Sequence, residues 1–134
     1  MPFKYERDEV HHRIVITFEG AFQISDALAS VERRRAESAT SQAVLVDIRA
    51  LVGHPSLEDL RQLLREELSI PTGGRPRGPV AIVATASSLY TKACTFAALA
   101  QSKLKVRVFR EVGEADSWLR AHTDDRSFLQ GTVH

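Results

Sequence analysis

Residues 43–48 read Ala-Val-Leu-Val-Asp-Ile, and the fold class follows most directly from these six residues. Every side chain in it except that of Asp47 is apolar, which is typical of a strand that is covered on both faces. Such a strand lies inside a sheet that carries helices on each side. The stretch therefore predicts an α/β domain.

The residues before this strand predict a β-hairpin followed by a helix. Residues 3–7 and the β-branched segment 13–19, which ends at Gly20, have the composition of two strands joined by a short turn. From Ser25, a favourable N-cap residue, the spacing of apolar residues becomes helical. The expected faces of this helix are an inner one with Ile24, Ala27, Leu28 and Val31, and a solvent one with Asp26, Glu32, Arg33 and Arg34.

The residues after the strand predict a second helix, a loop and another strand. His54-Pro55 ends the first strand, and Ser56 restarts the chain as a capped helix because its hydroxyl can accept a hydrogen bond from a first-turn amide. The side chains expected to face inward are Leu57, Leu60, Leu63, Leu64 and Leu68. Residues 71–79 are rich in proline and glycine, so they predict an exposed loop that leads into a strand over residues 80–84.

The last third of the chain repeats the alternation of helix and strand. Ser87 or Ser88 is expected to cap a third helix that covers about residues 89–101. Residues 104–110 alternate apolar and basic side chains, which is typical of a strand with one wet face or of a strand at a sheet edge.

A final helix is expected over about residues 114–122, with Trp118 and Leu119 turned inward. Residues 124–134 lack a pattern, and we expect a mobile tail there and a single domain over residues 1–123. The predicted order is β-β-α-β-α-β-α-β-α. Strands separated by helices imply parallel pairing with right-handed crossovers, and the opening hairpin adds an antiparallel strand.

Composition supports one soluble globular domain. The chain has 134 residues, of which 43% are hydrophobic and 26% charged, and this balance argues against disorder. Cys94 is the single cysteine, so an intrachain disulfide and a cysteine zinc site are excluded. The charged N-terminus lacks the apolar segment of a secretory signal, and no apolar run approaches the roughly 20 residues that span a bilayer. We expect a cytoplasmic protein.

Several segments, in their order and spacing, resemble one known family. They are residues 44–49, residues 78–84, and residues 106–110 followed by Glu114-Ala115 and Trp118-Leu119. This pattern is similar to the SpoIIAA-like branch of the STAS (anti-sigma-factor-antagonist) domains, and it extends from about Phe3 to Arg120. The resemblance implies a mixed, mostly parallel five-stranded sheet with four helices. It also implies a non-enzymatic protein that acts by binding.

The same resemblance draws attention to the start of the second helix. Regulatory STAS domains carry an Asp-Ser-Ser-Gly motif there, in which a serine is phosphorylated by a partner kinase. This chain reads His54-Pro55-Ser56-Leu57-Glu58, so Ser56 matches the first serine and Leu57 matches the one usually phosphorylated. Ser56 is either a phosphate-accepting site at a helix N-terminus or simply an N-cap.

The sequence gives only weak indications of a catalytic, nucleotide-binding or metal-binding site. Asp47, His54 and Ser56 contain the residue types of a hydrolase triad, but no G-x-S-x-G pattern accompanies them. The glycine- and arginine-rich residues 73–78 lead into a strand rather than a helix, which favours a linker over a nucleotide site. The histidines lack metal-ligand spacing. We therefore expect no catalytic residue, no metal and no cofactor.

Two features of residues 68–110 predict binding. The third helix has apolar residues on nearly all its faces, so a neighbouring helix, a second subunit, an apolar ligand or a membrane must cover it. No acidic residue lies between Glu67 and Glu111, whereas the same stretch carries Arg75, Arg77, Lys92, Lys103, Lys105, Arg107 and Arg110. Either acidic residues of the first half neutralise this basic stretch in the fold, or it contacts an anionic surface, for which Arg75, Arg77 and Lys92 are the candidates.

The preferred hypothesis is a STAS-type regulatory or interaction module, expected to be a homodimer that binds a protein or a ligand. The alternative is a carrier or sensor of an apolar, lipid-like ligand with reversible membrane contact, its pocket lying between the second and third helices and the sheet. The candidate binding residues are Asp47, Arg49, His54, Ser56, Thr85, Ser88, Tyr90 and Arg110. Nucleic acid is not expected, because no recognised motif or row of exposed aromatic residues accompanies the charge.

Overall fold

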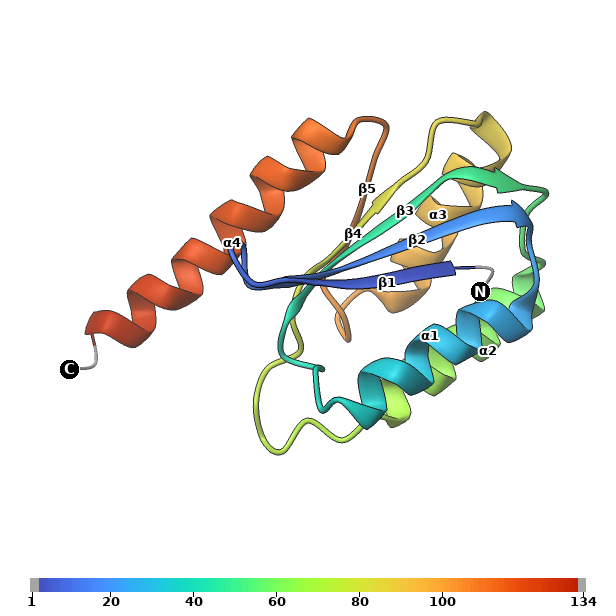
Figure 1. Cartoon of the computed structure of the whole chain (residues 1–134). Coiled ribbons are helices and arrows are strands. Elements are labelled where there is room, and N and C mark those ends of the chain that lie inside the picture. The colour runs from blue at the N-terminus through green and yellow to red at the C-terminus, as the bar shows by residue number, and fades with distance from the viewer. Residues whose placement is uncertain (1–2, 133–134) are drawn as a thin grey trace.

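Five strands and four helices alternate along the chain in the predicted order (Figure 1). The computed structural model describes the backbone of residues 3–132 and the side chains of residues 3–122. The strands are β1 (Phe3–Asp8), β2 (Arg13–Ala21), β3 (Ala43–Val52), β4 (Val80–Val83) and β5 (Val106–Phe109). The helices are α1 (Ile24–Ala36), α2 (Leu57–Ser69), α3 (Ser87–Ala100) and α4 (Val112–Thr132).

The strands form one sheet in the order β1-β2-β3-β4-β5. β1 pairs antiparallel with β2 as the predicted hairpin, and the other neighbours pair parallel. β5 lies at the edge of the sheet and exposes Arg107, in agreement with its alternating pattern. β3 runs past β4, because β4 pairs only with Val44–Asp47 while β2 pairs with β3 as far as Val52.

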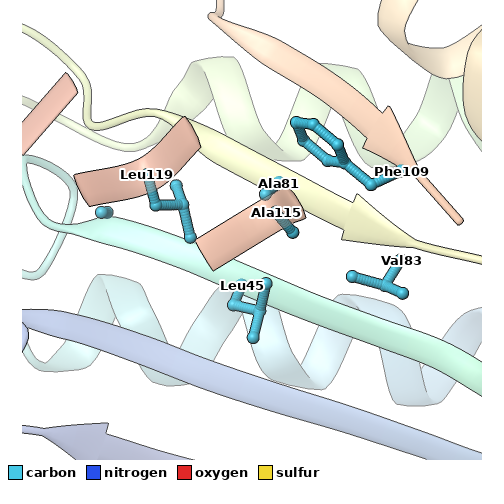
Figure 2. Packing of buried hydrophobic residues seen from close by; sticks show 7 residues of the cluster. Leu45, Ala81, Val83, Phe109, Ala115 and Leu119 are labelled. Carbon is cyan, nitrogen blue, oxygen red and sulfur yellow. The ribbon is translucent and has the colours of Figure 1, made fainter. Parts of the chain in front are cut away.

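Helices cover both faces of the sheet, as the apolar run of β3 predicts. On one face, Ala115 and Leu119 of α4 pack against Leu45, Ala81 and Val83 (Figure 2). The other face carries α1, α2 and α3, and α2 contacts both of its helical neighbours (Figure 1). Successive side chains of a strand point to opposite faces, so Ala43 and Leu45 of β3 meet α4, whereas Val44, Val46 and Ile48 face the three helices.

Two predicted N-caps are wrong. α1 begins at Ile24 with Gln23 as its N-cap, and α3 begins at Ser87 with Ala86 as its N-cap; neither cap residue makes a side-chain hydrogen bond. The preference of serine for the N-cap position does not decide where these two helices begin. We attribute their earlier starts to the direction of the backbone as it leaves β2 and β4. Ser56, in contrast, caps α2 as predicted.

Two predicted orientations and several boundaries also differ. Arg34 is buried rather than exposed, because it pairs with Glu67 of α2. Leu57 is 41% exposed rather than inward, because it is the first residue of α2 and protrudes at the helix end.

The bounds of three elements differ from the predicted ones. β5 is shorter than predicted, whereas β3 is longer. α4 continues to Thr132, past the expected helix end at residue 122. The mobility expected for residues 124–134 stays a prediction; residues 133–134 and side chains after residue 122 lie outside the described part.

Residues 71–79 form the predicted loop, but its end is held closely against the chain before β3. The Gly78 amide donates to the Thr40 carbonyl over 2.9 Å. A Cβ at Gly78 would overlap the backbone carbonyl of Gln42, so only glycine fits there without a backbone shift. This contact fixes the start of β4 beside β3.

Candidate functional site

A cavity of about 150 Å³ lies between the sheet and the three helices on its face. Its walls come from β2, β3 and β4 on one side and from α1, α2 and α3 on the other. They are mainly apolar and include Phe18, Phe22, Val46, Leu63, Ile82 and Phe96. Its position agrees with the pocket predicted between the second and third helices and the sheet, with α1 as an additional wall.

Four polar side chains, Ser30, Arg34, Glu67 and Lys92, interrupt this apolar lining. Arg34 and Glu67 form an ion pair whose side chains are only 6% and 13% exposed. The Ser30 hydroxyl donates to the Ala27 carbonyl over 2.7 Å, so its hydrogen is satisfied within α1. The cavity therefore combines an apolar wall with a small number of charged groups, as ligand sites commonly do.

Burial of Arg34 changes the pKa of its guanidinium group. Desolvation lowers the pKa of Arg34 to about 10, with Tyr5 opposing the shift and the positive charge of Arg77 adding to it. The guanidinium stays protonated at neutral pH. Its Nε is buried and has no hydrogen-bond partner among residues 3–122.

The sequence interpretation missed Arg34 and Glu67 as site residues. Arg34 stands in a run of arginines, which looks like a solvated face. Its spacing nevertheless indicates the interior, because Ala27, Val31 and Arg34 follow at the i, i+4, i+7 positions of one helix face. Glu67 lacks such a signal, since its burial depends on how α2 packs against α1.

The predicted binding residues lie near the carboxyl ends of the strands rather than in the cavity. Asp47 and Arg49 form a bidentate ion pair on β3, with Nε–Oδ1 and Nη2–Oδ2 distances of 2.9 and 2.8 Å. The Arg49 hydrogen bonds lower the pKa of Asp47, and the same bonds raise the pKa of Arg49. Asp47 and Arg49 thus neutralise each other's charge within β3.

A second set of contacts, also at the carboxyl ends of the strands, joins the residues after β4 and β5 to the start of α3. Arg110 Nη1 donates to the Thr85 carbonyl over 3.1 Å, and its guanidinium carbon lies 4.0 Å from the centre of the Tyr90 ring. The structure therefore brings Thr85, Tyr90 and Arg110 together, whereas Ser88 is exposed on the first turn of α3.

Ser56 and His54 lie at the start of α2. The Ser56 hydroxyl accepts from the Asp59 amide and the Asp59 carboxylate accepts from the Ser56 amide, each over 3.0 Å, which completes a capping box. His54 Nδ1 lies 3.3 Å from the Pro55 carbonyl. Asp47, His54 and Ser56 thus each bond elsewhere, and no hydrogen bond in the described structure joins them into a triad.

Two exposed apolar side chains that the sequence did not predict lie before and at the start of α2. Val52, at the end of β3, is 66% exposed, and Leu57 is 41% exposed. Val52 lies where β3 projects beyond β4, and Leu57 begins α2. We call Val52 and Leu57 the junction patch.

The basic stretch is not neutralised by acidic side chains. Within residues 3–122, no ion pair joins any of its seven basic side chains to a carboxylate. Arg77 nevertheless has partners within the fold, because its guanidinium donates hydrogen bonds to the carbonyls of Glu67, Leu68 and Ile70 at the end of α2. Arg75 is exposed, and Lys92 lines the cavity.

The wide apolar arc of α3 is covered largely by its neighbours. Leu89, Ala93 and Phe96 face the cavity with Leu60 and Leu63 of α2, and α3 also contacts β5. In the described part of the chain, no cluster of three or more His, Cys, Asp or Glu side chains could hold a metal ion. No helix there is long and apolar enough to cross a membrane.

No protein-family model and no curated protein matches the sequence. Several solved structures resemble the fold, and two of them are described here. One is an uncharacterised protein of the DUF3478 family with a SpoIIAA-like fold from Shewanella loihica PV-4, with a TM-score of 0.58 and 18% identity over 87% of this chain and 91% of that chain. The other is an anti-sigma factor antagonist from Mycobacterium paratuberculosis, with a TM-score of 0.58 and 15% identity over 88% of this chain and 94% of that chain. The chain has the SpoIIAA-like fold that the sequence predicts.

Proposed function

We propose that this protein is a non-enzymatic regulatory module of the STAS type, located in the cytoplasm, that binds a protein partner at the carboxyl edge of its sheet. The observation that carries this proposal is the junction patch. Val52 and Leu57 are two of the large apolar side chains that the fold leaves exposed, and exposed apolar surface is a common feature of interaction sites. The resemblance of the fold to that of an anti-sigma factor antagonist supports the same reading.

Polar groups lie near the carboxyl ends of the strands on the same side of the sheet. The Asp47–Arg49 ion pair and the Arg110–Tyr90 contact present paired charges and an aromatic ring near the strand ends. An apolar centre with a polar rim is the usual composition of a protein interface. We assign Val52 and Leu57 to the centre of this interface and the paired groups to its rim.

Binding at this edge does not require phosphorylation of Ser56 in our proposal. Its hydroxyl is engaged in the capping box, and Glu58 and Asp59 lie in the first turn of α2. A phosphate on Ser56 would lie beside these carboxylates and be repelled by them. Leu57 occupies the place of the usual phosphoserine and offers an apolar contact instead.

The test compares two valines with the same chemistry and different positions. Val52→Glu places a charge in the junction patch, whereas Val10→Glu makes the same change in the hairpin turn, where Val10 is 82% exposed. Proximity labelling in the native cell should recover a partner with the wild type and Val10→Glu but not with Val52→Glu. Equal recovery with both variants would refute this interface.

A second candidate function is a carrier or sensor of an apolar ligand that associates reversibly with membrane surfaces. The cavity and the unneutralised basic stretch support it. Native mass spectrometry followed by a denatured run tests the ligand, because bound mass should disappear on denaturation. A clean dimer without extra mass would instead support the homodimer that we propose for the interaction module.

Membrane contact has its own test. Replacing Arg75, Lys103 and Lys105 by glutamate should abolish binding to anionic liposomes, because it removes three exposed positive charges and adds three negative ones beside Arg107 and Arg110. Arg77 is left unchanged, since its substitution would disturb the end of α2. Liposome binding that survives the triple substitution would exclude this mode of association.

A further inference from the structure

We propose that the cavity binds an apolar molecule carrying a single carboxylate, which Arg34 holds at the polar end of the cavity. This inference rests on the second candidate function and adds the chemical class of its ligand. It depends on three observations: an unpaired donor, a charge balance and the shape of the apolar wall.

The unpaired donor belongs to Arg34. Its side chain is 6% exposed and lines the cavity, and one of its terminal nitrogens, Nη2, bonds to Glu67. Its Nε is buried and has no acceptor among residues 3–122. A buried donor without an acceptor is unfavourable, and a carboxylate oxygen is a strong acceptor for a guanidinium N–H. A ligand carboxylate would therefore satisfy a group that the protein leaves unpaired.

The charge balance of the cavity limits the ligand to one negative charge. Of the side chains that line it, Arg34 and Lys92 are positive and Glu67 is negative. Glu67 compensates Arg34, and Lys92 forms no ion pair within the described side chains. One carboxylate makes this set neutral, whereas an amine would add a third positive charge and a phosphate dianion would leave a negative excess.

The apolar wall extends along the strands away from Arg34. Arg34 and Glu67 lie near the ends of α1 and α2, beside the start of β3, while Phe22 and Leu51 lie at the opposite end of the cavity. A ligand with its carboxylate at Arg34 would therefore lay an apolar body along the strand direction. A cavity of about 150 Å³ has the size of those that hold one small aromatic molecule, so medium-chain acids fit better than long ones.

The experiment is isothermal titration with octanoic acid, octanol and octylamine. The wild type should bind octanoate at least about tenfold more tightly than octanol, and octylamine least. Hexanoate and dodecanoate then measure the preferred length. Thermal unfolding with each compound provides an independent readout, because a ligand that binds only the folded state raises the midpoint.

Two variants test the assignment to Arg34. The double variant Arg34→Met/Glu67→Met replaces the buried pair by apolar side chains of similar volume, a change that proteins often tolerate. It should bind octanoate and octanol equally. Glu67→Gln removes only the competing carboxylate, so it should strengthen octanoate binding without strengthening octanol binding. This single variant keeps the test decisive if the double variant does not fold.

The outcomes separate the two levels of the proposal. If the wild type binds none of the three compounds, both the carboxylate and the apolar-ligand function are refuted. If octanol binds as tightly as octanoate, the carboxylate is refuted while the apolar-ligand function stands. If octanoate preference persists in the double variant but disappears in Lys92→Gln, the anchor is Lys92 and the role of Arg34 is refuted.

Discussion

Arg77 offers a direct test of how the loop over residues 71–79 stabilises the fold. Its guanidinium donates to the carbonyls of Glu67, Leu68 and Ile70 over 2.9, 3.0 and 2.9 Å. The last carbonyls of a helix have no partner within the helix, so these three bonds close the end of α2. Arg77→Ala removes all of them at once.

The expected cost follows from the number of bonds and their exposure. Each hydrogen bond contributes a net stabilisation of about 0.5–1.5 kcal/mol. Arg77 is half-buried, so water can reach part of the vacated carbonyls and the lower half of that range applies. We expect Arg77→Ala to lower the free energy of unfolding by about 2 kcal/mol, and Arg77→Lys by about 1 kcal/mol, since a lysine cannot bond all three carbonyls.

The assay is urea unfolding followed by circular dichroism, and Arg75→Ala is the matched control. Arg75 lies in the same loop but is exposed and makes no side-chain hydrogen bond within the described side chains. Its loss should change stability by less than about 0.5 kcal/mol. Equal stability of the two alanine variants would refute the view that Arg77 closes α2.

Two further predictions concern tight or charged contacts. Gly78→Ala should cost about 3 kcal/mol in urea unfolding, because the added Cβ overlaps the Gln42 carbonyl; a cost under about 1 kcal/mol would contradict this. Asp116→Asn should cost about 2 kcal/mol at neutral pH, because Arg13, 4% exposed and bonded to Asp116 over 2.6 Å, loses its counter-charge. Desolvation raises the pKa of Asp116, but the Arg13 bond and charge lower it more, to below the ordinary 3.8. This stabilisation is therefore complete above that value and lost as pH falls through the folded-state pKa, so the two proteins should converge in acid. A difference independent of pH would contradict it.

The topology was predictable because it depends on local patterns. The apolar run of β3, the alternating residues of β5 and the helical spacing of α2 each reflect how a segment meets its neighbours. Ser56 was also predictable, because its partner Asp59 lies three residues away. Ser25 and Ser87 were not, because the direction in which the chain leaves a strand decides where those helices begin.

The cavity was predictable in place but not in composition. Its position follows from helices packed on a sheet, which the order of elements implies. Its charged pair depends on contact between Arg34 and Glu67, which lie on different helices. The residues predicted from the strand ends form a separate edge, where Asp47 and Arg110 bond to near neighbours rather than into the cavity.

The short, basic β5 has a consequence for how copies of this protein meet. A strand at a sheet edge offers unpaired amides and carbonyls to any other strand, including that of an identical molecule. Two β5 strands brought together would place Arg107 and the neighbouring Lys105 and Arg110 of one molecule against the same cations of the other, and like charges repel. Continuous sheets across molecules are thereby disfavoured at this edge. The charge that we propose for contact with an anionic surface would thus also disfavour aggregation through β5.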